Sequence, residues 1–276
     1  MKLYFICSDF FNYDKSIKKE LERIGYDVEL ITDYSMGNLI LYFQGIIKKK
    51  FENLDGDNIV FIIKGETLSK TALNNIFNKT KRVCIYQWDA LKNNCNSKCL
   101  LKYSEFITSF DPVDTCKYKL RYKALFHQME SFNQHSDREK NVGASFIGTV
   151  HEDRLKQLIE IETYLKKEGV SFFFYKYYPS KLIFFLRKII DTRLWGVNTK
   201  DVFFKPLEYS KYKEIIANSI SVIDFPRKAQ SGYTMRTIES LASNTKVITT
   251  AEYLEDKFVG INPDKLALAK MAIHRG

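Results

Sequence analysis

The residues with the clearest chemical potential lie between Ser221 and Thr250, in a basic loop that precedes a predicted helix. The loop holds Ser231, Gly232, Tyr233 and Thr234, so a glycine and the hydroxyls of Ser231 and Thr234 lie directly before the helix start. Free backbone N–H groups and the helix dipole make such a start an anion site. The segment therefore predicts a site for a phosphate or a pyrophosphate.

Two charged residues of the same predicted helix extend this site. Arg236 can hold phosphate oxygens, and Glu239, one turn further, can accept hydrogen bonds from ribose hydroxyls. We expect the apolar positions of the helix to face the sheet and these two residues to share its other side. An ordinary N-cap followed by an Arg–Glu surface pair is the alternative, and it stays open.

Alternating strand and helix patterns position these residues. The run Leu3–Cys7 predicts a first buried strand, Asp14 an N-cap and Gly25 a helix end. A second series of alternating strand and helix patterns starts at Ala144. We expect an α/β protein of two Rossmann-like doubly wound domains that face a cleft, with domain 1–132, linker 133–142 and domain 143–276.

Length and charge set limits on function. The 276 residues suggest about two domains. The net charge of +10 favours anionic partners. The pair Cys95 and Cys99 is poor evidence for zinc, and Asp55-Gly-Asp57 reads as a turn and not as a metal-binding motif. We expect no metal and no cofactor.

Several segments carry a resemblance to a known family. They are Ser231–Ala242 with Lys246–Thr250, Tyr86–Asp89, Ser109–Asp114 with Tyr122–Phe126, and Phe146–Arg154. Together they resemble the nucleotide-sugar signature of bacterial GT-B glycosyltransferases of the lipopolysaccharide core, O-antigen and capsule type. The second domain looks abbreviated against that family, since the chain stops at Gly276.

The resemblance implies a donor site without metal. Glu239 would hold the ribose, and the backbone of Ser231 to Thr234 the diphosphate, with Arg236 assisting. Arg154, after the strand that ends at Thr149, would be a second group for the diphosphate, or it is a solvated helix residue. The acidic residue that many retaining members carry upstream of the loop is not found here, so the stereochemistry stays open.

An inverting transfer needs a base for the proton of the acceptor hydroxyl. Asp89 and Asp9 are the candidates, because both follow predicted strands, and His151 is a weaker one. The ring of Trp88, beside Asp89, could stack on a sugar. A turn or helix-cap carboxylate is the alternative for both aspartates.

A basic and aromatic segment follows the strand Val170–Tyr175. Ser180 predicts an N-cap, after which Leu182, Phe185, Leu186 and Ile189 form an apolar stripe. Such a helix either lies on an anionic bilayer or faces the core. The apolar run at the N-terminus is too short for a signal peptide, and no apolar run is long enough to span a membrane. We therefore expect a cytoplasmic protein that is peripheral at the inner membrane face.

These patterns predict a glycosyltransferase that moves a sugar from a nucleotide-diphosphate sugar to a glycan or lipid-linked acceptor. Two alternatives stay open: an inactive relative that only binds nucleotide, and a basic nucleic-acid-binding protein. The basic residues are scattered and fit no nucleic-acid-binding motif, so we expect no nucleic-acid partner.

Overall fold

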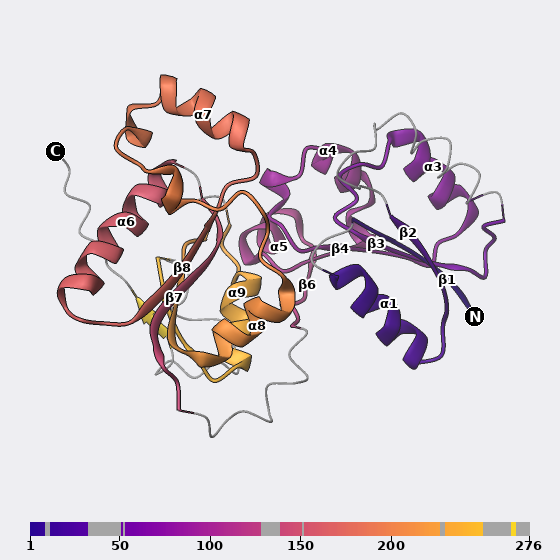
Figure 1. Ribbon diagram of the computed structural model, residues 1–276. Helices are drawn as coiled ribbons and strands as arrows, with labels where there is room; N and C mark the ends of the chain where they lie inside the picture. The colour runs from indigo at the N-terminus through magenta and orange to yellow at the C-terminus, as the bar shows by residue number, and fades with distance from the viewer. Residues whose placement is uncertain are drawn as a thin grey trace. The chain divides into compact units, whose positions relative to one another are not determined.

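The chain divides into two compact units (Figure 1). The computed structural model describes residues 1–8, 12–32, 51, 53–127, 139–150, 152–226, 230–250 and 266–268. Unit 1 comprises Met1–Gln128 and Arg227–Tyr233, and unit 2 comprises Met129–Pro226 and Thr234–Gly276. The sequence placed residues 230–233 in the second domain, whereas the structure groups them with unit 1. Most of the predicted linker lies outside the described residues.

Unit 1 contains a parallel sheet with the strand order β2-β1-β3-β4-β5-β6 in the part of the chain that the structure describes. The strands are β1 (Lys2–Cys7), β2 (Asp27–Thr32), β3 (Ile59–Ile63), β4 (Val83–Gln87), β5 (Ile107–Ser109) and β6 (Arg121–Tyr122). The predicted strand Leu3–Cys7 is confirmed and buried throughout, as expected for a parallel strand covered on both faces. The strand order reverses between β1 and β3.

Short helices connect these strands. They are α1 (Tyr13–Arg23), α3 (Lys70–Lys79), α4 (Ser97–Leu100) and α5 (Pro112–Tyr118), with 3₁₀ turns η1 (Leu91–Asn93) and η2 (Leu101–Phe106). The predicted N-cap Asp14 is wrong, because Asn12 precedes α1 and Asp14 lies in its first turn, where the dipole favours an acid. Gly25 follows the helix end with a φ of 99°, as predicted. The Asp55 carboxylate accepts the N–H groups of Asp57 and Asn58, so the predicted turn is confirmed.

Unit 2 repeats this arrangement. Its parallel sheet has the order β11-β10-β9-β7-β8 among the described residues. The strands are β7 (Val142–Thr149), β8 (Phe172–Tyr177), β9 (Ser219–Asp224), β10 (Lys246–Thr249) and β11 (Leu266–Leu268). The order reverses between β7 and β9, so both units are doubly wound sheets of the kind predicted.

Helices cover both faces of the unit 2 sheet. They are α6 (Glu152–Lys167), α7 (Lys181–Ile190), α8 (Tyr209–Asn218) and α9 (Met235–Ala242), with η4 (Thr192–Leu194) and η5 (Thr199–Asp201). Phe146 packs in a core cluster with Leu155 of α6, and its neighbour Ile147 packs with Ile216 of α8. Successive side chains of a strand point to opposite faces, so α6 and α8 lie on opposite sides of the sheet.

The helices seen here are short. Over the described ranges, none is both long enough and apolar enough to cross a bilayer.

Candidate functional site

The predicted donor residues of unit 2 gather where β7 and β9 end. Thr149 is the last residue of β7, and Arg154 lies in the first turns of α6. Arg236 and Glu239 lie on α9, which follows β9. In doubly wound sheets, ligands bind beyond the carboxyl ends of the strands where the strand order reverses. The topology therefore brings these four residues to the edge at which a ligand is expected.

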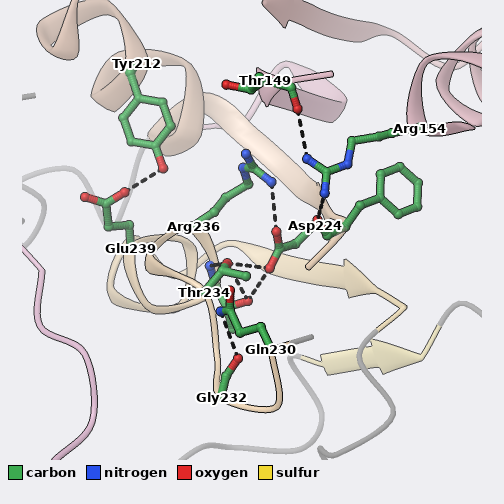
Figure 2. A network of polar contacts seen from close by, with 11 residues as sticks. Thr149, Arg154, Tyr212, Asp224, Gln230, Gly232, Thr234, Arg236 and Glu239 are labelled. Atoms are coloured by element: carbon green, nitrogen blue, oxygen red, sulfur yellow. Dashed lines mark hydrogen bonds and ion pairs between the residues drawn. The ribbon is translucent and has the colours of Figure 1, made fainter. Parts of the chain in front are cut away.

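A buried carboxylate, Asp224, organises this edge (Figure 2). Asp224 ends β9 and is 1% exposed. Its Oδ2 accepts hydrogen bonds from the hydroxyls of Thr234 (2.5 Å) and Thr237 (2.6 Å), and its Oδ1 accepts from Nη1 of Arg236 (2.8 Å). A buried charge needs such partners, because its desolvation is costly. These bonds fix the first turn of α9 against the end of β9.

Sequence reasoning gave Asp224 no role. The signal that was available is an aspartate at a strand end, followed after a loop by Thr234 and Thr237 at helix-cap spacing. Thr234 is the N-cap of α9, and its hydroxyl accepts from the N–H of Thr237 at 3.1 Å. The N-cap part of the alternative considered above is therefore correct.

Arg236 packs against the end of β7. Its guanidinium carbon is 5.0 Å from the centre of the Phe146 ring, within the range of a cation–π contact. A Cβ atom added at Gly148 would lie 2.2 Å from Nη2 of Arg236. Gly148 thus leaves the space that the guanidinium fills, and the pair with Asp224 determines its direction.

Glu239 is buried, which the sequence did not predict. It is 3% exposed, and its two carboxylate oxygens accept from the hydroxyls of Tyr209 (3.0 Å) and Tyr212 (2.6 Å). Burial and the Glu239 charge raise the pKa of Tyr212 well above its usual value, although Arg236 acts in the opposite direction. The predicted shared outer side of Arg236 and Glu239 is wrong, because helix α8 covers Glu239. Tyr209, which the sequence analysis did not select, lies one turn from Tyr212.

Arg154 bridges the two strand ends. Its Nη1 donates to the carbonyl oxygen of Thr149 at 2.8 Å, and its Nη2 donates to that of Phe225 at 2.6 Å (Figure 2). These two bonds determine the orientation of the guanidinium. The bonds exclude the solvated-helix interpretation of Arg154. Thr149 contributes its backbone to this contact.

The predicted phosphate loop is bound to an anion of the protein itself. In unit 1, Oδ2 of Asp111 accepts from the N–H groups of Ser231 (2.7 Å) and Gly232 (3.4 Å), and Oδ1 accepts from the Ser231 hydroxyl. Asp111 is also the N-cap of α5, where it accepts from the N–H of Val113 at 3.0 Å. The N–H groups of this loop therefore bind a carboxylate, and a diphosphate would compete with Asp111 for them.

Packing around the loop reinforces this arrangement. A Cβ atom at Gly232 would lie 2.7 Å from both the ring and the carbonyl oxygen of Phe110, so the loop approaches β5 as closely as a glycine permits. Tyr233 is buried, and this burial raises the pKa of its phenol. The side chain of Gln230 donates to the carbonyl of Gly232 at 3.1 Å (Figure 2). The structure thus separates Ser231, Gly232 and Tyr233, in unit 1, from Thr234, which begins the second segment of unit 2.

The candidate base Asp89 lies at the carboxyl edge of the unit 1 sheet. Its carboxylate is 3.1 Å from Nζ of Lys64, which also contacts Glu66 at 2.9 Å. Burial lowers the pKa of Lys64, but Asp89 and Glu66 outweigh this effect and raise it overall. Lys64 has a φ of 62°, and its carbonyl accepts from the side chains of Gln87 and Asn94. A non-glycine residue in this region is uncommon and costs free energy, which these bonds offset.

Two other candidate bases, Asp9 and His151, lie outside the described residues. The predicted role of Trp88 as a sugar platform is not supported. Trp88 is 8% exposed, and its ring packs edge-on against Tyr13 with a centroid distance of 6.2 Å. No group of three or more histidine, cysteine, aspartate or glutamate side chains is placed to hold a metal ion, as far as the described residues show.

Comparison by sequence gives no match, neither to a family model nor to a curated protein. Comparison by structure gives several matches. The UDP-GlcNAc 2-epimerase of Methanocaldococcus jannaschii, in complex with UDP-GlcNAc and UDP, is 13% identical, with 91% of this chain and 84% of that chain covered and a TM-score of 0.54. The catalytic domain of starch synthase IV from Arabidopsis thaliana, bound to ADP and acarbose, is 11% identical, with coverage of 96% and 86% and a TM-score of 0.54.

The chain has a GT-B fold. The two doubly wound units correspond to the two Rossmann-like domains that the resemblance implied. A third structure, the lipopolysaccharide outer core galactosyltransferase WaaB in its apo form, is 12% identical and covers 90% of this chain and 80% of that chain. Its TM-score is 0.49. The GT-B fold is thus shared with an epimerase and with a starch synthase, and the fold by itself does not select between such activities.

Proposed function

We propose that this protein is a glycosyltransferase that takes its sugar from a nucleotide-diphosphate donor bound by unit 2. The observation that carries the proposal is the group at the strand ends, where Arg154 and Arg236 lie beside the start of α9 and Glu239 lies further along that helix. Guanidinium groups and helix starts bind phosphate oxygens, and carboxylates bind hydroxyls. Both chemistries that a nucleotide sugar requires are therefore within one region.

The charges of this group suit a diphosphate. Arg236 pairs with Asp224, and the Arg154 guanidinium is oriented by the carbonyl oxygens of Thr149 and Phe225. The developing charge of the leaving diphosphate would be stabilised by the two arginines and by the dipole of α9. We propose that these groups take the part that a metal ion plays in other transferases, so that a chelator leaves the activity unchanged.

Glu239 is proposed as the residue that orients the ribose. A carboxylate offers about four lone-pair sites, and the hydroxyls of Tyr209 and Tyr212 show that this one accepts from hydroxyl donors. Because Glu239 is buried, ribose binding requires the hydrogen bond from Tyr209 or from Tyr212 of α8 to break. Tyr212, with a pKa raised well above its usual value by burial and by Glu239, stays protonated and keeps its hydrogen to donate.

The proposed reaction exchanges one bond at the sugar. The acceptor hydroxyl oxygen bonds to the anomeric carbon, the bond from that carbon to the diphosphate oxygen breaks, and the proton of the hydroxyl moves to a base. We propose Asp89 for this role, with Asp9 as the second candidate. The Asp89 carboxylate forms an ion pair with Nζ of Lys64 at 3.1 Å, which holds it at the carboxyl edge of the unit 1 sheet. The acceptor is proposed to be a glycan or a lipid-linked glycan.

A donor panel tests the proposal. The wild type and Glu239→Gln are titrated calorimetrically with UDP-, GDP-, CMP- and dTDP-linked sugars. Glutamine keeps the size of the side chain but loses its charge, so we expect one donor class to bind the wild type and to lose at least about tenfold in affinity for the variant. Glu214→Gln is the matched control, since Glu214 is exposed on the neighbouring helix α8.

The same samples separate transfer from its alternatives. Release of nucleoside diphosphate that depends on an acceptor supports the transferase, whereas a C2 epimer of the donor sugar, formed without acceptor, indicates an epimerase. Donor binding with no turnover would identify an inactive relative. If no donor binds, and oligonucleotides bind with a steep loss in salt, the proposal is refuted in favour of a nucleic-acid-binding protein.

A further inference from the structure

Helix α7 turns its apolar side outward. Of its large apolar side chains only Phe184 is buried. The others are Leu182 (69% exposed), Ile183 (49%), Phe185 (43%), Leu186 (52%), Ile189 (75%) and Ile190 (84%). Ser180 caps the helix as predicted, by accepting from the N–H of Ile183. The core-facing interpretation of the apolar stripe is therefore wrong.

The exposed side chains form one continuous face. At about 100° per residue, the six apolar positions of α7 span an arc of about 160° around the helix axis. Arg187 falls just beyond one edge of this arc, and Lys181 and Lys188 fall beyond the other. Contiguous exposed apolar faces of this kind are uncommon on proteins that have no partner for them.

The face is held by packing beneath it. The Phe184 ring meets the rings of Tyr178 and Phe204, with centroid distances of 5.2 and 5.7 Å. At the helix end, Nζ of Lys188 donates to the carbonyl of Val197 at 2.6 Å, and Nε1 of Trp195 donates to the carbonyl of Lys188 at 3.0 Å. The indole of Trp195 is thereby fixed at the end of α7 while 65% of this residue stays exposed.

The segment that carries this face is basic. Residues 181–205 contain six lysines and arginines against two aspartates, a net charge of +4. A tryptophan with its N–H satisfied and its ring exposed is typical of the membrane interface, where one end of the side chain is apolar and the other polar. The combination of apolar arc, flanking cations and exposed indole matches a helix that lies in the plane of an anionic bilayer.

We infer that the outward face of α7, together with Trp195, is a docking surface for an anionic lipid bilayer. The apolar side chains enter the boundary between headgroups and acyl chains, and Lys181 and Arg187 remain at the level of the lipid phosphates. The inference is independent of the proposed transferase activity, because it uses no residue of the donor site.

Charge favours a bilayer over a second copy of this chain as the partner of the outward face of α7. Self-association through α7 would bring together two copies of this segment, each with a net charge of +4, and like charges at an interface oppose binding. An anionic membrane pairs the same charges with opposite ones. The oligomeric state is nevertheless one outcome of the test below.

Vesicle flotation tests the inference with the full chain. We expect binding to vesicles in which about a third of the lipid is phosphatidylglycerol, little binding to pure phosphatidylcholine, and weakening as salt shortens the Debye length below about 10 Å. Leu186→Ser should lower the partition coefficient about tenfold, since one leucine leaves the bilayer. Ile24→Ser is the matched control: Ile24 is 55% exposed, as against 52% for Leu186, but lies at the end of α1.

Tryptophan fluorescence gives a second readout. The chain has two tryptophans, of which Trp88 is 8% exposed and Trp195 65% exposed. On binding to anionic vesicles the emission of Trp195 should shift to the blue and be quenched by lipids that carry a spin label near the headgroup. Trp195→Phe should abolish the shift, and Trp88→Phe should keep it.

Three results would overturn the inference. The first is the absence of any binding to anionic vesicles. The second is binding that Leu186→Ser and Ile24→Ser weaken equally. The third is a dimer in solution, without lipid, that Leu186→Ser converts to a monomer, which would show that a second copy covers α7.

Discussion

Gly148→Ala is expected to break the contact between Arg236 and Asp224. The new methyl group would lie 2.2 Å from Nη2 of Arg236, so the guanidinium must move away from the end of β7. Asp224, which is 1% exposed, then loses a charge-assisted bond of about 1.5–3 kcal/mol. The stacking of Arg236 on Phe146 adds about 0.5–1 kcal/mol. Alanine also lowers the conformational entropy of the unfolded chain, which stabilises the folded state by about 0.4–1 kcal/mol.

The net expectation is a destabilisation of about 1–3.5 kcal/mol, seen in scanning calorimetry as a fall in Tm of roughly 3–10 °C. Gly56→Ala is the matched control, because its nearest non-neighbouring atom is 3.9 Å away and its φ is not positive. The control should be neutral or slightly stabilising. Donor binding should weaken with Gly148→Ala, since the displaced arginine belongs to the proposed diphosphate site.

A double-mutant cycle isolates the cause. Arg236→Gln removes the atoms that the new methyl group meets, so Gly148→Ala should cost nothing further in that background. An equal cost of Gly148→Ala in both backgrounds would refute the reasoning, and it would show that the glycine is needed for its backbone alone.

Further predictions concern the buried polar groups. Tyr212→Phe removes a donor 2.6 Å from the buried Glu239 carboxylate and should cost about 1.5–3 kcal/mol in urea unfolding; an unchanged midpoint would contradict the contact. The raised pKa of Tyr212 means that the folded state keeps this proton when the unfolded chain loses it, so its stabilisation is complete below pH 10 and is lost at higher pH. This alkaline loss should be smaller in Tyr212→Phe, and equal losses in both proteins would exclude Tyr212 as its source. Asp111→Asn keeps the cap of α5 but should accelerate hydrogen exchange at the Ser231 amide, whereas unchanged exchange there would argue against the Asp111 contact.

Local patterns were sufficient for the elements of this fold. The apolar run Leu3–Cys7 became a buried strand, Ser180 capped α7, and Gly25 ended α1. Each of these depends on neighbours in the chain, since caps and strand faces are decided within a few residues. The two doubly wound units followed from the repetition of the same patterns.

These local patterns did not predict which side chains would pair with each other. The sequence set Arg236 beside Glu239 because they are three residues apart, but Arg236 pairs with Asp224 and Glu239 with two tyrosines of α8. The loop at Ser231 was correctly seen to suit an anion, yet the anion in the structure is Asp111, about 120 residues away in the chain. Such contacts depend on which distant segments of the chain pack together.

The sequence by itself determined the α/β elements, the helix caps and the kinds of side chain that lie at the strand ends. Only the tertiary structure decided that Glu239 is buried, that Arg154 joins the ends of β7 and β9, and that the apolar side of α7 faces outward. The physical reason is that periodicity shows which residues of a helix share a side, whereas burial depends on what packs against that side. Of the large apolar side chains of α7, only Phe184 is buried by such packing, and the others face outward.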